Sequence, residues 1–208
     1  MYRLKQEGLK LDITEGARLC GRLGMPQGEA VQLLPKEIVP FHLAPGVRER
    51  EGKWLHFFVD DYRFERVWNM PRRYLKLLME FEGVIGVDFS MYVDMPRAQQ
   101  IWNCYRNRAM DYWLRKNGVN VIPAVSWSDR ESLSWCFDGL PRHSTLSVST
   151  NGCLKNTETK YLFWRGYQRM LEELRPTRII VVGQAFPGME NDPVVFFESY
   201  SQMMRKRL

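Results

Sequence analysis

From residue 53 onward, short runs of apolar residues alternate with longer segments of helical periodicity. Helices are expected from the cap at Asp94 to the stop at Asn117, and from the cap at Asn156 to Pro176. Alternation of strands and helices predicts an α/β fold. The apolar runs that we interpret as strands cover residues 54–59, 84–87, 119–127, 145–149 and 178–182.

These runs are almost wholly apolar, as in Arg178–Val182. We therefore expect a mainly parallel sheet of five or six strands with helices on both faces, because parallel strands are buried on both sides. A last run, Val194–Phe197, follows a short loop and is expected to be an edge strand or an antiparallel strand. The strand count suits an open sheet and a partial barrel equally.

The segment 1–52 has a different character, because glycine and proline punctuate it so often that only short elements fit. One helix is expected there, from an N-cap at Asp12 to a stop near Gly24. We divide the chain into an irregular N-terminal segment, 1–52, packed on an α/β domain, 53–208.

The composition is that of a globular protein with a modest basic excess. Of the 208 residues, 45% are hydrophobic and 26% are charged, which excludes a disordered or fibrous chain. The net charge of +6 is concentrated at residues 63–76, at 97–116 and in the tail Arg205-Lys206-Arg207, which favours a polyanionic partner. The opening Met1–Glu7 has no apolar signal core and no run is long enough to cross a membrane, so we expect a cytoplasmic protein without a membrane partner.

Acidic residues follow several of the predicted strands. In parallel sheets, ligands bind at the carboxyl ends of the strands, and carboxylates there suit acid–base chemistry or Mg²⁺ binding. We expect Asp60 and Asp88 as metal ligands, with Mg²⁺ as the candidate cofactor. The alternative is that these residues cap the following helices. The candidate catalytic residues are Asp88, Asp60, Asp61 and Asp129.

Polar and cationic side chains also lie along one face of the predicted helix at 97–116. Amides and guanidinium groups in such a stripe read base edges or hold phosphates, and an aromatic residue at a strand end can stack on a base. The alternative is a hydrated helix face, or hydrogen bonds from these side chains to neighbouring loops. The candidate nucleic-acid-binding residues are Arg97, Asn103, Arg106, Asn107, Arg108 and Trp127.

From about residue 33 to 198 the chain resembles an uncharacterised family of bacteria and their phages, catalogued as a domain of unknown function. The resemblance implies a gene carried by phages and other mobile elements, with work in replication, transfer or conflict with host defences. The motifs that carry it are Asp60–Trp68, Asp88–Pro96, Ile101–Arg108, Trp127–Asp129 with Cys136–Gly139, and Ser147–Thr150 with Gly152–Cys153.

We interpret the chain as a phage or mobile-element accessory protein that binds nucleic acid or a nucleotide at the strand-end rim, with Mg²⁺-dependent phosphoryl transfer as its candidate chemistry. The alternative is a non-catalytic protein-binding module that inhibits a host nuclease or defence complex. An enzyme acting on a small metabolite has only the α/β architecture in its favour, and a fold is a weak indication of function. Oligomeric state and catalysis itself stay open.

Overall fold

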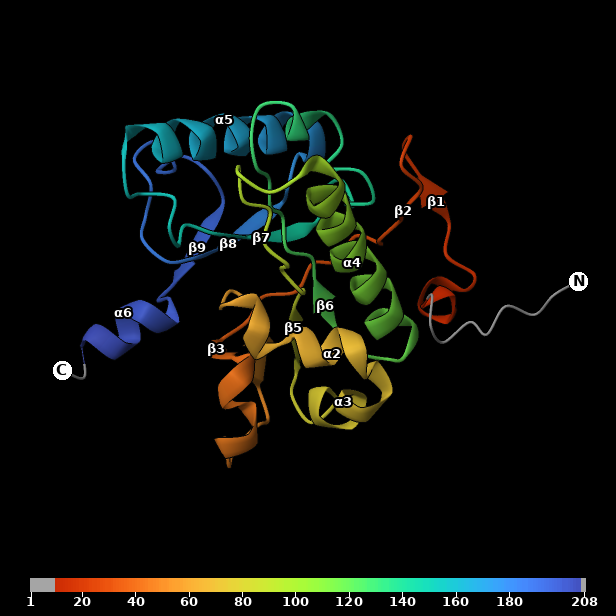
Figure 1. Ribbon diagram of the computed structural model, residues 1–208. Helices are drawn as coiled ribbons and strands as arrows, with labels where there is room; N and C mark the ends of the chain where they lie inside the picture. The colour runs from red at the N-terminus through yellow and green to blue at the C-terminus, as the bar shows by residue number, and fades with distance from the viewer. Residues whose placement is uncertain (1–9, 207–208) are drawn as a thin grey trace, which may run out of the picture.

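The computed structural model describes residues 10–206 of the chain. The opening Met1–Glu7 and Arg207 of the basic tail therefore lie outside the described residues. Within the described part, two parallel sheets have the strand orders β3-β4-β5-β6 and β7-β8-β9 (Figure 1). Their bounds are β3 (Glu37–Pro40), β4 (Lys53–His56), β5 (Gly83–Ile85), β6 (Val121–Ile122), β7 (Thr145–Ser149), β8 (Arg178–Val182) and β9 (Val194–Phe197).

One further parallel bridge, between Ala124 and Ser147, joins the two sheets. The predicted α/β fold with mainly parallel strands is thus confirmed, but within residues 10–206 the parallel strands number seven, in sheets of four and three, instead of five or six in one sheet. The additional strand is β3, which lies inside the segment that we expected to be irregular. The last strand, β9, is a parallel edge strand.

The seven strands curve into a partial barrel. In a flat sheet, the first and last strands of this order would lie about 29 Å apart. The residues that follow them are instead in contact, because the ring of Tyr200 after β9 meets the ring of His42 after β3 edge-on, at 4.6 Å between centroids. The sheet must therefore bend until its two ends approach each other.

The inner face of this curved sheet is filled by side chains from the strands themselves. A buried cluster gathers side chains from both sheets, among them Trp54, Ile85, Ile122 and Ile180, and none of its buried members lies in a helix. The prediction of helices on both faces is wrong for this reason. Curvature replaces the second helical layer with side chains from the opposite strands.

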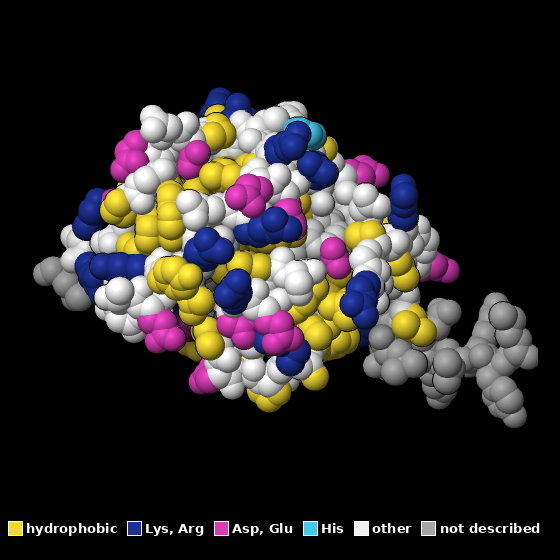
Figure 2. Space-filling model, turned by 90° about the horizontal axis from the view of Figure 1, so that it is seen from above, with side chains coloured by type: hydrophobic (Ala, Val, Ile, Leu, Met, Phe, Trp, Pro, Cys, Tyr) yellow, Lys and Arg dark blue, Asp and Glu magenta, His cyan; other side chains and the backbone are white. Residues whose placement is uncertain are grey.

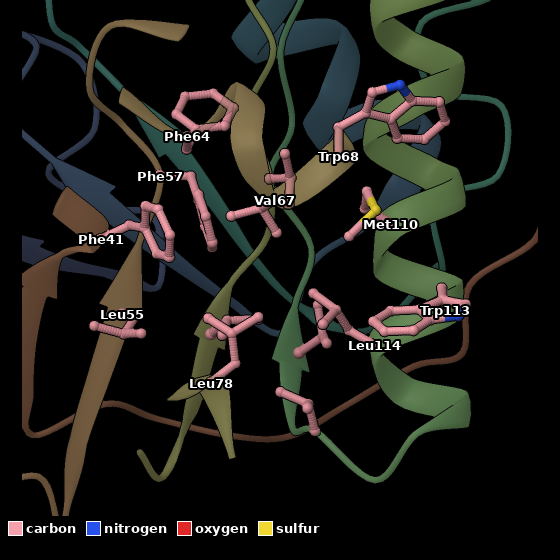
Figure 3. Packing of buried hydrophobic residues seen from close by; sticks show 14 of the residues in the cluster. Phe41, Leu55, Phe57, Phe64, Val67, Trp68, Leu78, Met110, Trp113 and Leu114 are labelled. Atoms are coloured by element: carbon pink, nitrogen blue, oxygen red, sulfur yellow. The ribbon is translucent and has the colours of Figure 1, made fainter. Parts of the chain in front are cut away.

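The helices pack on the outer face. Met110, Trp113 and Leu114 of α4 project toward the strands, and Val67 of α2 joins the same cluster (Figure 3). A second outer cluster packs α4 and α5 against β7 and β8. The helix bounds are α2 (Glu65–Asn69), α3 (Pro71–Leu78), α4 (Arg97–Lys116), α5 (Thr157–Leu174) and the short α6 (Tyr200–Arg205).

The N-terminal segment contains short elements instead of the helix expected from Asp12 to Gly24. A 3₁₀ turn spans Leu11–Thr14, and a hairpin pairs β1 (Leu19–Cys20) with β2 (Met25–Pro26). Three glycines at 16, 21 and 24 have positive φ, which interrupts a right-handed helix.

After this hairpin the chain crosses the amino end of the barrel. The backbone N–H of Thr145, at the start of β7, donates to the carbonyl of Val31 at 2.7 Å. Val31 and Leu33 then pack against the inner cluster. The segment therefore covers the amino end of the strands, opposite to the end where their carboxyl ends meet.

Candidate functional site

The loop that follows β5 carries Asp88 at the carboxyl ends of the strands. Three amides on one face of α4 hold its backbone. Because α4 crosses directly behind the loop, this part of the polar stripe has a structural task inside the fold. The pairs are Asn107 with the Phe89 N–H (2.8 Å) and C=O (3.3 Å), Asn103 with the Ser90 C=O (2.6 Å), and Gln100 with the Tyr92 and Met95 C=O groups (3.0 Å each).

Two carboxylates lie against the same loop. Asp61, after β4, accepts hydrogen bonds from the backbone N–H (3.1 Å) and the hydroxyl (2.8 Å) of Ser90. Asp111, on α4, is buried beside Gly86. A Cβ on Gly86 would lie 2.6 Å from Asp111 Oδ1, so the glycine permits this close approach.

Asp88 itself is not used to hold the loop. Its Oδ1 atom is buried and has no hydrogen-bond partner within residues 10–206. The pKa of Asp88 is raised to about 7; burial is the main cause and the Asp61 carboxylate adds to it, while the Ser126 hydroxyl and the charge of Arg108 act in the opposite direction. A carboxyl group that titrates near neutral pH can both donate and accept a proton there.

Groups from the next strands complete the surroundings of Asp88. Ser126 follows β6, and its hydroxyl acts to lower the pKa of Asp88. Cys153 follows β7, where burial and then the charge of Asp88 raise the pKa of its thiol to about 11. Asp88 therefore lies where the segments after β4, β5, β6 and β7 converge, and Cys153 is a neutral thiol in this position.

The other two predicted catalytic acids have different surroundings. Asp60 is exposed, and its carboxylate pairs with Nε of Arg63 at 3.2 Å. Asp129 receives both terminal nitrogens of Arg97, at 3.1 and 2.8 Å, and the hydrogen bond from Arg97 lowers the pKa of Asp129. Of the predicted acids, the structure thus brings Asp61 and Asp88 together.

The residues that the structure describes contain no group of three or more His, Cys, Asp or Glu side chains arranged to hold a metal ion. Asp60 pairs with Arg63, and the pKa of Asp88 is raised to about 7, mainly by burial. Mg²⁺ is usually held by one or two carboxylates together with substrate phosphates. The assignment of Asp60 and Asp88 as Mg²⁺ ligands stays a prediction.

The three arginines predicted to bind nucleic acid are engaged inside the fold. Arg108 is 3% exposed and donates to the backbone carbonyls of Ala124, Cys136 and Asp138. These bonds tie α4 to the segments after β6. A phosphate would have to displace them, so Arg108 acts as a structural residue.

Arg106 and Arg97 are similarly occupied. Arg106 donates to both carboxylate oxygens of Glu65, at 2.8 and 3.0 Å, and its guanidinium lies 3.6 Å from the centre of the Phe89 ring. Arg97 joins the first turn of α4 to Asp129 and Glu131. The alternative interpretation of the helix stripe, hydrogen bonding to neighbouring loops, describes these residues better than phosphate binding does.

Asn103, Asn107 and Trp127 are also unsuited to direct contact with bases. Both amides are buried and bound to the Asp88 loop. The indole N–H of Trp127 donates to the Leu162 carbonyl at 3.1 Å, and the ring lies against Gly166 of α5. The expected stacking platform is therefore a packing contact between the strand end and α5.

The model of a family described as a domain of unknown function (DUF4417) matches residues 17–200. The chain belongs to this family. The resemblance noted in the sequence is thereby confirmed. Comparison with solved structures found no match.

Two relatives of this DUF4417 chain are phage proteins. The Gene 1 protein of Mycobacterium phage L5 is 34% identical over 163 residues, which cover 75% of this chain and 71% of the relative. The Gene 1 protein of Mycobacterium phage D29 is 35% identical over 173 residues, which cover 78% of this chain and 64% of the relative. The match to the D29 protein thus spans slightly less than two thirds of its length.

Several residues at the same end of the barrel were missed from the sequence. His56 ends β4 and His42 lies two residues after the neighbouring strand β3, and all four of their ring nitrogens are buried with no partner among the described residues. Burial, and then the nearby His42, lower the pKa of His56 to about 3, so this imidazole is neutral. Asp111 could have been predicted from the sequence as part of the site, since it follows Asn103 and Asn107 at helical spacing on one face of α4.

No helix in the described part of this DUF4417 chain is both long and apolar enough to cross a membrane.

Proposed function

We propose that this DUF4417 chain binds a nucleotide or a short single strand of nucleic acid at the carboxyl ends of its strands, and that Asp88 transfers a proton to or from the bound ligand. One observation carries the proposal: a buried carboxyl oxygen without a partner among the described residues, at the point where four strand ends converge. Buried polar groups are otherwise hydrogen-bonded, and exceptions concentrate at functional sites.

An exposed aromatic and cationic pair beside this point supports a nucleotide ligand. Tyr62 is 73% exposed, and the Arg63 guanidinium lies 5.2 Å from the centre of its ring and 5.9 Å from that of Tyr200. Tyr62 directly follows Asp61, which contacts the Asp88 loop. An aromatic face next to a cation is suited to stack a base and hold a phosphate.

The charge distribution favours a small ligand over a long duplex. Figure 2 shows Lys and Arg side chains interspersed with Asp and Glu on the face that it presents, without one continuous basic field. The net charge of +6 is modest, the cation of Arg108 is buried, and those of Arg97 and Arg106 are paired with carboxylates. A duplex binder needs many free phosphate contacts.

The experiment is fluorescence anisotropy with labelled mononucleotides, single-stranded DNA and RNA, and duplex DNA, at about 50 and 200 mM salt. We expect binding of the single-stranded or mononucleotide probes, with a shallow dependence on salt. Tyr62→Ala and Arg63→Ala should weaken binding, and Tyr62→Phe should retain it because stacking is retained. Arg169→Ala is the matched control, since Arg169 is an exposed arginine paired with local carboxylates on α5.

Binding that is unaffected in folded Tyr62→Ala and Arg63→Ala proteins contradicts the proposed site. The contribution of Asp88 is read separately, by comparing wild type with Asp88→Asn for binding at pH 6 and pH 8 and for any conversion of the bound nucleotide. Equal loss in Arg169→Ala would indicate a non-specific charge effect.

A specific observation also favours the alternative, a non-catalytic protein-binding module. Tyr92 and Val93, on the loop held by Gln100, are 58% and 55% exposed, and Trp102 on the adjacent turn of α4 is 45% exposed. Exposed aromatic side chains near each other are typical of protein interfaces. This function predicts a stoichiometric complex with a host nuclease or defence protein that Trp102→Ala abolishes and Asp88→Asn leaves intact.

A further inference from the structure

We propose that a terminal phosphate group of the ligand binds between Arg63 and Arg66, beside the imidazole of His42. The inference rests on the proposed function, in which a nucleotide or a short single strand binds at this end of the barrel. It adds which part of that ligand is recognised. A terminal phosphate is carried by a nucleoside monophosphate and by the phosphorylated end of a strand.

Aromatic rings that follow β3 and β9 bring the two guanidinium groups together. The Arg66 guanidinium lies 5.4 Å from the centre of the Phe41 ring, and the Arg63 guanidinium lies 5.9 Å from the centre of the Tyr200 ring. The Tyr200 ring in turn meets the ring of His42, the residue after Phe41, at 4.6 Å between centroids. Both cations therefore approach the same two residues at the carboxyl end of β3.

Both arginines have N–H groups that the fold does not use. Nε of Arg63 donates to Asp60 at 3.2 Å, and the two terminal nitrogens of Arg63 have no acceptor within residues 10–206. Arg66 is exposed and pairs with no carboxylate in the described part of the chain, and its guanidinium is held over the rings of Phe41 and Tyr74, at 5.4 and 5.7 Å. A ring face attracts the cation and leaves its donors available for a phosphate, which arginine binds through two parallel hydrogen bonds.

His42 has a hydrogen-bond donor without an acceptor. Both of its ring nitrogens are buried and have no partner among the described residues. Burial, and then the charges of Arg63 and Arg66, lower the pKa of His42, so the ring is neutral and carries one N–H. A phosphate oxygen between the arginines supplies the missing acceptor. Tyr200 lies edge-on to this ring on α6, a helix without buried residues, and moves aside to admit the phosphate.

These donors match a terminal phosphate better than a phosphate inside a strand. A terminal phosphate has three strong acceptor oxygens and nearly two negative charges at neutral pH. A phosphate that links two nucleotides has two free oxygens and one charge. Two guanidinium groups and an imidazole N–H can therefore be satisfied together only by the terminal group.

The phosphate site lies within reach of the same ligand that meets Asp88. Asp61 and Arg63 are two residues apart in one 3₁₀ turn, which corresponds to about 4 Å along its axis. Asp61 binds Ser90 of the Asp88 loop at 2.8 Å, and Arg63 extends to Tyr200. One nucleotide can thus contact the Asp88 loop and place its phosphate on the arginines.

The test compares ligands that differ only in the terminal phosphate. Fluorescence anisotropy uses one oligonucleotide labelled at its 3′ end, with a 5′-phosphate or a 5′-hydroxyl, and calorimetry compares adenosine monophosphate with adenosine. We expect the phosphorylated form to bind the wild-type chain at least about tenfold more tightly, because hydrogen bonds between charged groups are strong. The larger of the two preferences identifies the strand end or the mononucleotide as the ligand.

Two variants remove the proposed donors. Arg66→Met keeps an apolar cover over the Phe41 ring and should abolish the preference for the phosphorylated form. His42→Phe keeps an aromatic ring against Tyr200 and should reduce the preference. Arg73→Met is the matched control, because Arg73 is an exposed arginine on α3 that also pairs with no carboxylate in the described part of the chain.

Equal binding of the phosphorylated and unphosphorylated forms by wild type, in both comparisons, overturns the inference. A preference that survives intact in either folded variant overturns it as well. An equal loss in Arg73→Met would reduce the effect to general charge attraction and has the same consequence. Thermal unfolding shows whether each variant is folded, and the wild-type comparison does not depend on any variant.

The outcome is separable from that of the proposed function. If wild type ignores the terminal phosphate but Tyr62→Ala and Arg63→Ala weaken both forms equally, the proposed function stands and this inference fails. If the preference is lost in Arg66→Met while Tyr62→Ala and Asp88→Asn bind and process the ligand like wild type, the phosphate site stands and the proposed function fails.

Discussion

Asn107 binds Phe89 through both backbone groups of that residue, accepting its N–H at 2.8 Å and donating to its carbonyl at 3.3 Å. This pair fixes the loop that carries Asp88 to the middle of α4. The polar face of α4, which the sequence predicts as a nucleic-acid-binding surface, therefore supports the loop of the candidate site.

Replacement of Asn107 by alanine should cost about 3 kcal/mol in the free energy of unfolding, because two buried backbone groups of Phe89 lose their partner. Urea unfolding monitored by tryptophan fluorescence measures the loss. Asn120→Ala is the control, since Asn120 is exposed and makes one bond to the Glu82 carbonyl. A loss in Asn107→Ala no larger than in the control would show that the loop does not depend on this pair.

Gly166→Ala should destabilise the protein by about 1–3 kcal/mol, although alanine favours a helix more than glycine does. A Cβ at position 166 would overlap the indole ring of Trp127, so α5 or the strand end has to move. Gly46→Ala places its Cβ in open space and should have little effect. Thermal unfolding of both variants checks the prediction, and a stabilised Gly166→Ala protein would contradict it.

His56 should make the stability of the protein depend on pH between about 7 and 3. The pKa of His56 is about 3 in the folded protein and 6.5 in the unfolded chain, so acidification protonates the unfolded chain first. Stability is then lost as pH falls below 6.5, by about 2 kcal/mol at pH 5 for this residue.

The measurement compares urea unfolding of wild type and His56→Leu at pH 7 and pH 5. All other titrating groups are common to both proteins, so the difference isolates His56. Parallel curves for wild type and His56→Leu would indicate that the imidazole is solvated or protonated in the folded state.

Asp88 should have the opposite effect from His56 on the pH dependence of stability. Its folded pKa of about 7 lies above the usual value of 3.8, so the folded protein holds an extra proton between these values and loses stability as pH rises through this range. Asp88→Asn removes the penalty, and should gain about 2.6 kcal/mol more over wild type at pH 8 than at pH 5. Equal gains at both pH values would mean that Asp88 has an ordinary pKa. A more stable but inactive variant is the usual sign of a functional residue.

The fold was predictable where local pattern was decisive. The runs 145–149, 178–182 and 194–197 are strands with those bounds, because each is a short β-branched or aromatic run ended by turn residues. The run 119–127 forms a regular strand at Val121–Ile122 and a single further bridge at Ala124, since Pro123 interrupts it. Strand β3 was missed because its ends lie among prolines. The curvature that replaces the second helical layer depends on distant contacts and leaves no local signal.

The sequence predicted where the candidate site lies in the fold, but only some of the residues that form it. Parallel strands put Asp61 and Asp88 at one end, as expected. The roles of Asn103, Asn107 and Arg108 depend on which backbone groups α4 meets after folding, and spacing along a helix does not contain that information. The alternative of hydrogen bonds to neighbouring loops was the correct interpretation for these residues.

The segment that crosses the amino end of the barrel links residues far apart in the sequence. Val31 binds Ser144, 113 positions later, and Gln32 accepts from Thr177, 145 positions later. During synthesis, the beginning of the chain must therefore wait until most of the protein has left the ribosome before it can dock. Contacts this distant slow folding and expose apolar surface meanwhile. The contacts of Val31 and Gln32 with Ser144 and Thr177 can thus form only after those residues have been synthesised.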